Sequence, residues 1–568
     1  MDRVTKANIR AFRDEQSFPA GYDESKLFEH FANYCVITEA YGEEFDIHDV
    51  HSGGGNDLTI DGLAVIVNGV LVLAIEEAKD LLDTNKHLEV DFIFVQAKSG
   101  SNFSGEEMVA FKDGVKDFFS EELKLPVSEK ISERRKLMSW IYENGDRFKQ
   151  RNPNCEMHFV TTGSWQDDHQ LMVRIERILA EVKETSLFNE VRFVPVGAKG
   201  IQESWRRSKD SVEAEFNFAK KTTLPDIDGV EESYLGVLPV SEFLKVISDD
   251  ESGIKKHIFV DNVRDYQGDN SVNVEMSESL QTPEGRARFA VLNNGVTLVA
   301  RGLKNVADKF TASDYQIVNG CQTSHVVYNN KDILGDDMPI PFKVIATNNE
   351  DVISAIATAT NRQTQVTVED LFALTEFQKD LENFLGSFEG KQKLHYERRS
   401  RQYAQLTGIE KVRIITKQIE IRAFAAVFLN DAHRAARYYN ELKADVGKSM
   451  FRTDHKLDPY YAAAYAYYRL EYLFRNGLIP VSYKPARYHL LMTYKNLVCA
   501  PDMPAFTANK IVSYSRTLTD SLWDESKSLA GFERACRVVD EALGETPLTN
   551  DAVKTRQFTE RVLAASKA

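Results

Sequence analysis

The chain has 568 residues, 43% of them hydrophobic and 27% charged, as in ordinary globular proteins, and no apolar run reaches the roughly 18 residues of a membrane helix. The formal net charge of -16 argues against a broad, non-specific DNA-binding surface, because Lys and Arg supply most of the affinity for phosphates. The N-terminus is too charged for a signal peptide, which indicates a cytoplasmic protein. The five cysteines are scattered along the chain, so neither a disulfide framework nor a thiolate zinc site is expected.

The first part of the chain alternates predicted helices and strands. A helix over 22–40 is followed by a Gly-rich turn, SGGGND, and by the run 61–73, which is expected to fold into a hairpin at Asn68-Gly69. The elements that follow are a helix over 74–87, a strand over 90–98, helices within 104–150, a strand MHFVTT, a helix over 168–184 and a strand VRFVPV. This alternation predicts an α/β layered domain over residues 1–215.

The rest of the chain changes pattern twice, which gives three expected domains. Residues 216–409 are richer in strands and turns and predict an α+β, strand-rich domain, whereas 410–568 predict an all-α region. The clearest helix runs from Pro459 to Phe474, with Asp458 as its cap and Gly477 at its end. One face of this helix carries four tyrosines, expected in the core or at a dimer interface: Tyr461, Tyr465, Tyr468 and Tyr472.

Two predicted strands carry polar residues where an apolar run starts or ends. On strand 90–98, Gln96 and Lys98 share a face with Phe94, and a buried Gln or Lys is costly without partners. Asp61 stands at the start of the other strand, so pairing the two would bring the three polar residues together. Each of them alone is more simply a turn residue or a strand end, but the combination predicts an active site.

The grouping suits hydrolysis of phosphodiester bonds. Asp61, Gln96 and the backbone carbonyl of Ala97 would bind Mg²⁺, with Mn²⁺ as a substitute, since hard cations prefer oxygen ligands. The metal would lower the pKa of a bound water, and Lys98 would orient that water or offset charge on the phosphoryl oxygens. Glu29, on the early helix, is a candidate further contact with metal or water.

Two histidines near this region are predicted to be unrelated to the site. His48 and His51 lie beside Asp46 and Asp49, but no cysteine or further histidine follows at zinc-site spacing. Ordinary surface histidines in a loop are therefore expected.

The order of these elements resembles the Mrr-like restriction endonucleases of the PD-(D/E)XK superfamily. The resemblance rests on Phe28-Glu29, on GGGNDLTIDG and on FIFVQAK, and it implies a restriction-endonuclease-like fold with Asp61, Gln96, Lys98 and Glu29 as catalytic residues. Gln96 departs from the superfamily's usual Glu. The long interval between Asp61 and Gln96 leaves Asp57 as an alternative metal ligand, although Asp61 stands directly at the strand start.

Polar motifs in the central region suggest a second site. Asn294-Gly295 suits a tight hairpin turn, whereas VNGCQTS places hydrogen-bonding groups where a helix could begin. A pocket for a nucleotide or nucleic acid is predicted here, lined by residues of this motif and of the loop NRQTQV: Asn319, Gln322, Arg362 and Gln365.

Four motifs in order resemble the AIPR (abortive infection phage resistance) family: FVQAK at 94–98, NNGVT at 293–297, IVNGCQT at 317–323 and NRQTQV at 361–366. The resemblance implies a bacterial anti-phage protein acting through nucleic-acid damage. We therefore expect a metal-dependent nuclease, acting on DNA rather than RNA, as a homodimer. The alternatives are a catalytically silent sensor and a nuclease switched on by a phage-derived ligand at the central domain.

Overall fold

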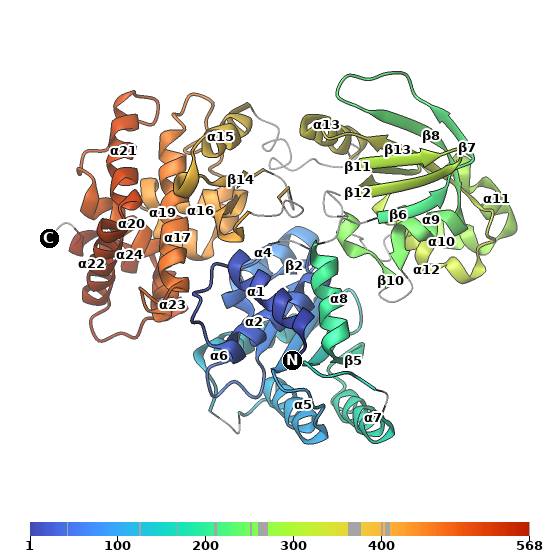
Figure 1. Cartoon of the computed structure of the whole chain (residues 1–568), viewed down its shortest axis with the longest axis horizontal. Helices are drawn as coiled ribbons and strands as arrows, with labels where there is room; N and C mark the ends of the chain where they lie inside the picture. Colours follow the sequence, from blue (N-terminus) through green and yellow to red (C-terminus); the bar gives the residue numbers. More distant parts are fainter. Residues whose placement is uncertain are drawn as a thin grey trace. The chain divides into compact units, whose positions relative to one another are not determined.

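The structure is a computed structural model of the whole chain, shown in Figure 1. It describes residues 1–42, 44–123, 126–166, 168–209, 213–249, 253–259, 271–361, 376–398, 402–403 and 409–566. The packing divides the chain into two compact units. The first comprises Met1–Ile37, Glu44–Trp205 and Thr375–Ala568, and the second comprises Thr38–Glu43 and Arg206–Leu374.

The N-terminal part of the first unit is built on a five-stranded sheet in the order β2-β1-β3-β4-β5. The antiparallel hairpin of β1 and β2 turns at Asn68 and Gly69, whose φ values of 50° and 80° suit this tight turn. β1 also pairs antiparallel with β3, while β3, β4 and β5 are parallel. The strands are β1 (Gly62–Val67), β2 (Val70–Leu71), β3 (Val90–Lys98), β4 (Asn154–Thr161) and β5 (Val191–Val196). The hairpin and the strands predicted from the sequence are confirmed.

Helices cover both faces of this sheet. On one face, Phe94 and other alternate strand residues form a core with α5, α6 and α7, and on the other face α2 lies against β1. The helices are α1 (Arg3–Glu15), α2 (Glu24–Ala40), α3 (Ile47–Val50), α4 (Ile75–Asn85), α5 (Gly105–Phe119), α6 (Glu129–Glu143), α7 (His169–Lys183) and α8 (Ala198–Lys209). The chain therefore begins with a mixed α/β part, as its alternating pattern predicts.

The C-terminal part of the first unit is helical (Figure 1). Its helices are α15 (Glu376–Gly386), α16 (Lys417–Leu429), α17 (Ala432–Arg437), α18 (Tyr439–Lys443), α19 (Asp458–Arg475), α20 (Arg487–Val498), α21 (Lys510–Trp523), α22 (Glu525–Leu543), α23 (Asn550–Val553) and α24 (Arg556–Ala565), with one short strand pair, β14 (His395–Glu397) and β15 (Ile414–Thr416). The sequence predicts three domains, whereas the packing groups these helices with the α/β part. Ion pairs join the two parts, among them Lys484 with Asp46 at 2.8 Å.

Helix α19 is the long helix predicted from the sequence, but it begins one residue earlier than expected. Asp458 is its first helical residue rather than its cap, and Gly477, at φ 66°, follows its end. The tyrosines of α19 pack within the unit: Tyr461 stacks on Phe388 with 3.8 Å between ring centroids, and Tyr465 donates to the Lys391 carbonyl at 3.2 Å. Of the four tyrosines predicted to lie in the core or at a dimer interface, Tyr461, Tyr465 and Tyr468 are buried in the core, whereas Tyr472 is partly buried.

The second unit contains a six-stranded sheet in the order β6-β12-β11-β13-β8-β7. Its strands are β6 (Glu213–Asn217), β7 (Lys220–Thr223), β8 (Glu232–Pro239), β11 (Val296–Val306), β12 (Lys309–Asn319) and β13 (Pro339–Ala346), with a separate pair of β9 (Ser248–Asp249) and β10 (Gly253–Ile254). A core forms between one sheet face and α9 (Val240–Ile247), α10 (Ser271–Gln281), α11 (Pro283–Leu292) and α12 (Cys321–Asn329), and α13 (Glu350–Asn361) packs on the other.

An ion-pair cluster at the sheet of the first unit gives a testable pH dependence. Glu156 of β4 pairs with His158, 3.2 Å away, and with Arg192 of β5. Burial by itself would raise the pKa of the Glu156 carboxyl, but His158 and Arg192 together lower it to about 2. Because the folded-state pKa lies below the ordinary value of 4.5, the pair stabilises the fold above that pH and loses its effect as the pH falls toward 2.

We therefore expect Glu156→Gln to cost about 2 kcal/mol of unfolding free energy near neutral pH, and far less near about pH 2. Thermal unfolding of both proteins across this range measures the difference. Glu190→Gln is the control, because this carboxylate is 63% exposed and 4.0 Å from Arg192. A cost that stays constant down to low pH would contradict the assignment.

Candidate functional site

Asp61 lies immediately before β1, against the end of β3. Its N–H donates to the Val95 carbonyl at 2.9 Å, and its carboxylate oxygen Oδ2 accepts a hydrogen bond from the Ala97 N–H at 2.8 Å. The side chain is only 9% exposed. The two contacts fix the carboxylate at the end of the strand that carries Gln96 and Lys98.

Gln96 lies between the two points at which Asp61 contacts β3. Its side chain is 3% exposed, and among the described residues no group donates to its amide oxygen Oε1. A buried carbonyl oxygen without a donor is costly in a folded protein, so this atom is suited to a ligand such as a cation. Lys98, the last residue of β3, is partly exposed and reaches the solvent side of the same strand end.

The helix α2 brings Glu29 to this place and is anchored beside Asp61. The Asn33 side-chain amide of α2 donates to the Asp61 carbonyl at 2.9 Å. Gly62 permits this approach, because a Cβ there would lie 2.1 Å from the Asn33 side-chain oxygen. Glu29 Oε2 in turn lies 3.0 Å from His51 Nε2.

The residues around Asp61 alter the pKa of its carboxyl group. Burial, together with the nearby charges of Glu29 and Asp57, raises the pKa of the Asp61 carboxyl to about 7, although the Ala97 hydrogen bond and Lys98 act in the opposite direction. Asp57 itself accepts from the Thr59 N–H at 3.0 Å, within the turn that precedes the strand. Of the two acidic residues that the sequence leaves open, Asp61 is therefore the one fixed at the end of β3.

His48 and His51 are not surface histidines in a loop, and that prediction is wrong. His48 lies in α3, and the rings of His30 and His51 lie close together, with centroids 4.2 Å apart. Burial lowers the pKa of both His30 and His48 well below the usual value. Sequence spacing could not reveal that His51 meets Glu29, because the two residues are brought together only by the packing of α2. Among the described residues, there is still no cluster of three or more His, Cys, Asp or Glu side chains that could hold a metal.

In the second unit, two of the central motifs meet. The Asn293 side chain donates to the Thr323 hydroxyl at 3.2 Å, and Thr297 pairs with Asn319 across β11 and β12. The helix α12 begins at Cys321, as the motif predicts, after Gly320 in a left-handed conformation at φ 100°.

The remaining predictions for the central region concern the turn at Asn294-Gly295 and the proposed pocket residues. Asn294-Gly295 does not form a hairpin turn but connects α11 to β11, where Gly295, at φ 80°, lies too close to Pro341 for a side chain. Gln322 accepts a hydrogen bond from the Asn273 side chain at 2.6 Å. Arg362 and Gln365 lie outside the described residues, so their predicted place in a pocket with Asn319 and Gln322 is untested.

Comparison with protein families gives one match. The family model described as "AIPR protein" matches residues 259–544, just over half of the chain. The chain belongs to the AIPR family. This membership suggests a role in anti-phage defence and agrees with the motifs of the central region. The matched range begins after the first α/β part, so it does not include Asp61, Gln96 or Lys98. The comparison with curated proteins and the comparison with solved structures gave no match.

None of the described helices is both long enough and apolar enough to cross a lipid bilayer.

Proposed function

We propose that the α/β part of the first unit is a Mg²⁺-dependent nuclease of the Mrr-like PD-(D/E)XK type, acting on DNA in anti-phage defence. The observation that carries the proposal is that two buried oxygen donors lie at the same end of β3: the Asp61 carboxylate, held there by the Ala97 N–H, and the amide oxygen of Gln96, which no group of the described residues satisfies. Glu29 and Lys98 lie within electrostatic range of the same carboxylate. Membership of the AIPR family supplies the defence context.

The donor set fits a hard divalent cation. Asp61 keeps its second oxygen available, because the Ala97 N–H occupies Oδ2, and the Gln96 Oε1 supplies a neutral oxygen beside it. Ala97 contacts Asp61 through the Ala97 N–H. The backbone carbonyl oxygen of Ala97 is a further proposed ligand of the cation. Mn²⁺ would be accepted at the same oxygens. When bound, the cation would polarise the scissile phosphate and promote ionisation of an attacking water.

The protein's own groups divide the remaining work. Lys98 would place a positive charge beside the phosphoryl oxygens, where negative charge develops in the transition state. Glu29 would orient the attacking water or accept its proton, and His51, 3.0 Å away, holds this carboxylate in position. Asp61, whose pKa of about 7 shows a poorly tolerated negative charge, gains a favourable partner when a cation is present.

Cleavage of a panel of single-stranded and duplex DNA and RNA, in Mg²⁺ and in Mn²⁺, tests this proposal. We expect the wild-type protein to cut DNA and Lys98→Ala to cut on the order of a hundredfold more slowly, because one charge that stabilises the transition state is removed. Lys199→Ala is the matched control, since this lysine of α8 is 91% exposed. Equal cleavage by wild type and Lys98→Ala would reject the assignment of the site.

A catalytically silent nucleic-acid sensor is the second candidate. It is favoured by Gln96 in place of a carboxylate and by the lack of a cluster of three acidic or histidine side chains in the described parts of the chain. DNA binding without cleavage in either metal, retained in Lys98→Ala, would select this function.

A further inference from the structure

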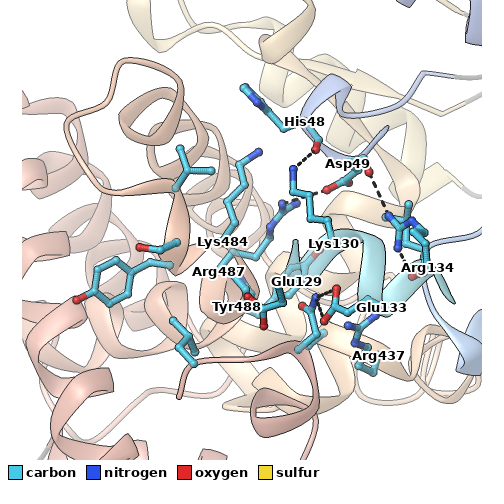
Figure 2. Close-up of a pocket in the computed structure, with 18 of the residues that line it drawn as sticks. His48, Asp49, Glu129, Lys130, Glu133, Arg134, Arg437, Lys484, Arg487 and Tyr488 are labelled. Carbon is cyan, nitrogen blue, oxygen red and sulfur yellow. Dashed lines mark hydrogen bonds and ion pairs between the residues drawn. The ribbon is translucent and has the colours of Figure 1, made fainter. Parts of the chain in front are cut away.

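A cavity in the first unit lies between the α/β part and the C-terminal helices. Its volume is about 680 Å³, within the range of small-molecule sites. Figure 2 shows the side chains that line it, which come from α3 and α6 on one side and from the segment leading into α20 on the other. The sequence predicts a ligand pocket in the central region, and nothing in the sequence indicates this one.

One end of the cavity is basic. Lys130 of α6 donates to the backbone carbonyls of His48 and His51 at 2.8 and 2.9 Å, and Arg134, one turn further along the helix, donates to the carbonyls of Leu73 and Asp49. For neither cation does the described part of the chain provide a carboxylate at ion-pairing distance. Neutral carbonyls satisfy their hydrogen bonds, and the carboxylate of Asp49 acts on both cations only from beyond ion-pairing distance.

Donor atoms at this cavity also lack partners. Arg422 is 8% exposed and lines the cavity, and its guanidinium lies 3.3 Å from Glu77, yet within the described residues its Nε is buried without a hydrogen-bond acceptor. His48 Nε2 is likewise buried without a partner there. An arginine Nε can only donate, so the missing partner is an acceptor. The positive charge around Lys130 is itself unfavourable: burial, Lys484 and Arg134 lower the pKa of Lys130 to about 8. An anion bound in the cavity would accept a hydrogen bond from Arg422 and would offset the positive charge of Lys130.

The other end of the cavity is acidic and rich in hydrogen-bonding groups. Glu129 and Glu133 project from α6, one turn apart, and Glu133 accepts from the Asn550 side chain at 2.6 Å (Figure 2). The Tyr483 hydroxyl donates to Asp540 at 2.6 Å nearby. Carboxylates of this kind accept hydrogen bonds from hydroxyl and amino groups, as acidic residues do with ribose hydroxyls in nucleotide sites.

We infer that this cavity binds a nucleotide, with its phosphates at the Lys130 and Arg134 end and its hydroxyl or amino groups at the Glu129 and Glu133 end. Phosphate is the chemistry that clustered arginine and lysine side chains recognise best. The inference does not rest on the nuclease proposal, because none of these side chains belongs to the set of Asp61, Gln96 and Lys98.

The test is calorimetric binding to the full chain, with ATP, adenosine and pyrophosphate as probes and EDTA present, so that the proposed metal site is not involved. We expect saturable binding of ATP, at least about tenfold tighter than that of adenosine or pyrophosphate alone, because ATP contacts both ends of the cavity. Arg437→Ala and Lys130→Met should each weaken ATP binding about tenfold, since Arg437 also lines the cavity. Lys527→Ala is the control, as its side chain is 71% exposed in α22 and lines no part of the cavity.

Because Lys130 donates to two backbone carbonyls, the unfolding temperature of Lys130→Met without nucleotide is first compared with that of the wild type. Arg437→Ala leaves both of these hydrogen bonds in place. No binding of ATP by the wild type would overturn the inference. If pyrophosphate bound as tightly as ATP, the acidic end of the cavity would have no role in binding. If ATP bound equally well to Arg437→Ala and to a folded Lys130→Met, the nucleotide site would lie elsewhere.

Discussion

Replacing Asp61 by asparagine is expected to abolish cleavage, by on the order of a thousandfold, and at the same time to stabilise the metal-free protein. Activity falls because the proposed cation loses the carboxylate that is buried at the end of β3. Stability rises because the Asp61 carboxyl has its pKa raised to about 7, so its ionisation opposes folding, and an amide of equal size can still accept from Ala97.

The sign of the stability change follows from the raised pKa. The folded protein binds the Asp61 proton more tightly than the unfolded chain, so the wild type loses stability as the pH rises from about 4 to about 7 and the variant does not. At about pH 8 without metal, we expect the Asp61→Asn variant to be about 2 kcal/mol more stable than the wild type, as measured by thermal unfolding.

Magnesium provides the control for this experiment. A ligand that binds only the folded state stabilises it, so Mg²⁺ should raise the unfolding temperature of the wild type and leave that of Asp61→Asn unchanged. A variant that is less stable than the wild type without metal, or that responds equally to Mg²⁺, would show that Asp61 is a structural turn residue instead.

Replacing Gly114 by alanine is expected to lower the free energy of unfolding by about 2–3 kcal/mol. Gly114 lies on α5, where a Cβ would come within 1.7 Å of the Leu58 carbonyl oxygen and 3.0 Å of the Thr59 hydroxyl. The contacted atom at Leu58 is backbone, so relief requires either α5 or the turn before β1 to move. Alanine favours helix formation more than glycine, and the expected loss therefore opposes the local helix preference.

The same substitution should also reduce cleavage, because the displaced turn leads directly to Asp61. Thr59 is tied to α5 by a hydrogen bond from its hydroxyl to the Ala110 carbonyl at 3.1 Å, so the turn and the helix move together. Gly386→Ala at the end of α15 is the control, since a Cβ there meets no atom within 4 Å. Equal unfolding temperatures for the two variants would contradict the predicted clash.

Local patterns in the sequence account for the helices and strands and for the order of the candidate site residues. Alternation of apolar residues identified β3, and the Asn68-Gly69 pair identified the hairpin, because both signals depend on neighbours in the chain. The sequence also placed Asp61 at the start of one strand and Gln96 and Lys98 at the end of another, so that pairing of the two strands would bring the three together, and the structure shows this pairing to be antiparallel. Its four motifs indicated the family that the comparison then matched, and three of them, at 293–297, 317–323 and 361–366, lie within the matched range.

Only the tertiary structure decided which distant residues meet. Three features join segments that are far apart in the chain: the contact of His51 with Glu29, the burial of His48, and the packing of the C-terminal helices against the α/β part. The periodicity of the sequence does not encode such contacts. The cavity lined by Lys130 and Arg422 has the same origin, because its walls come from α6 and from helices some three hundred residues later. Local patterns specify helices and strands, whereas a site between them depends on how their side chains pack.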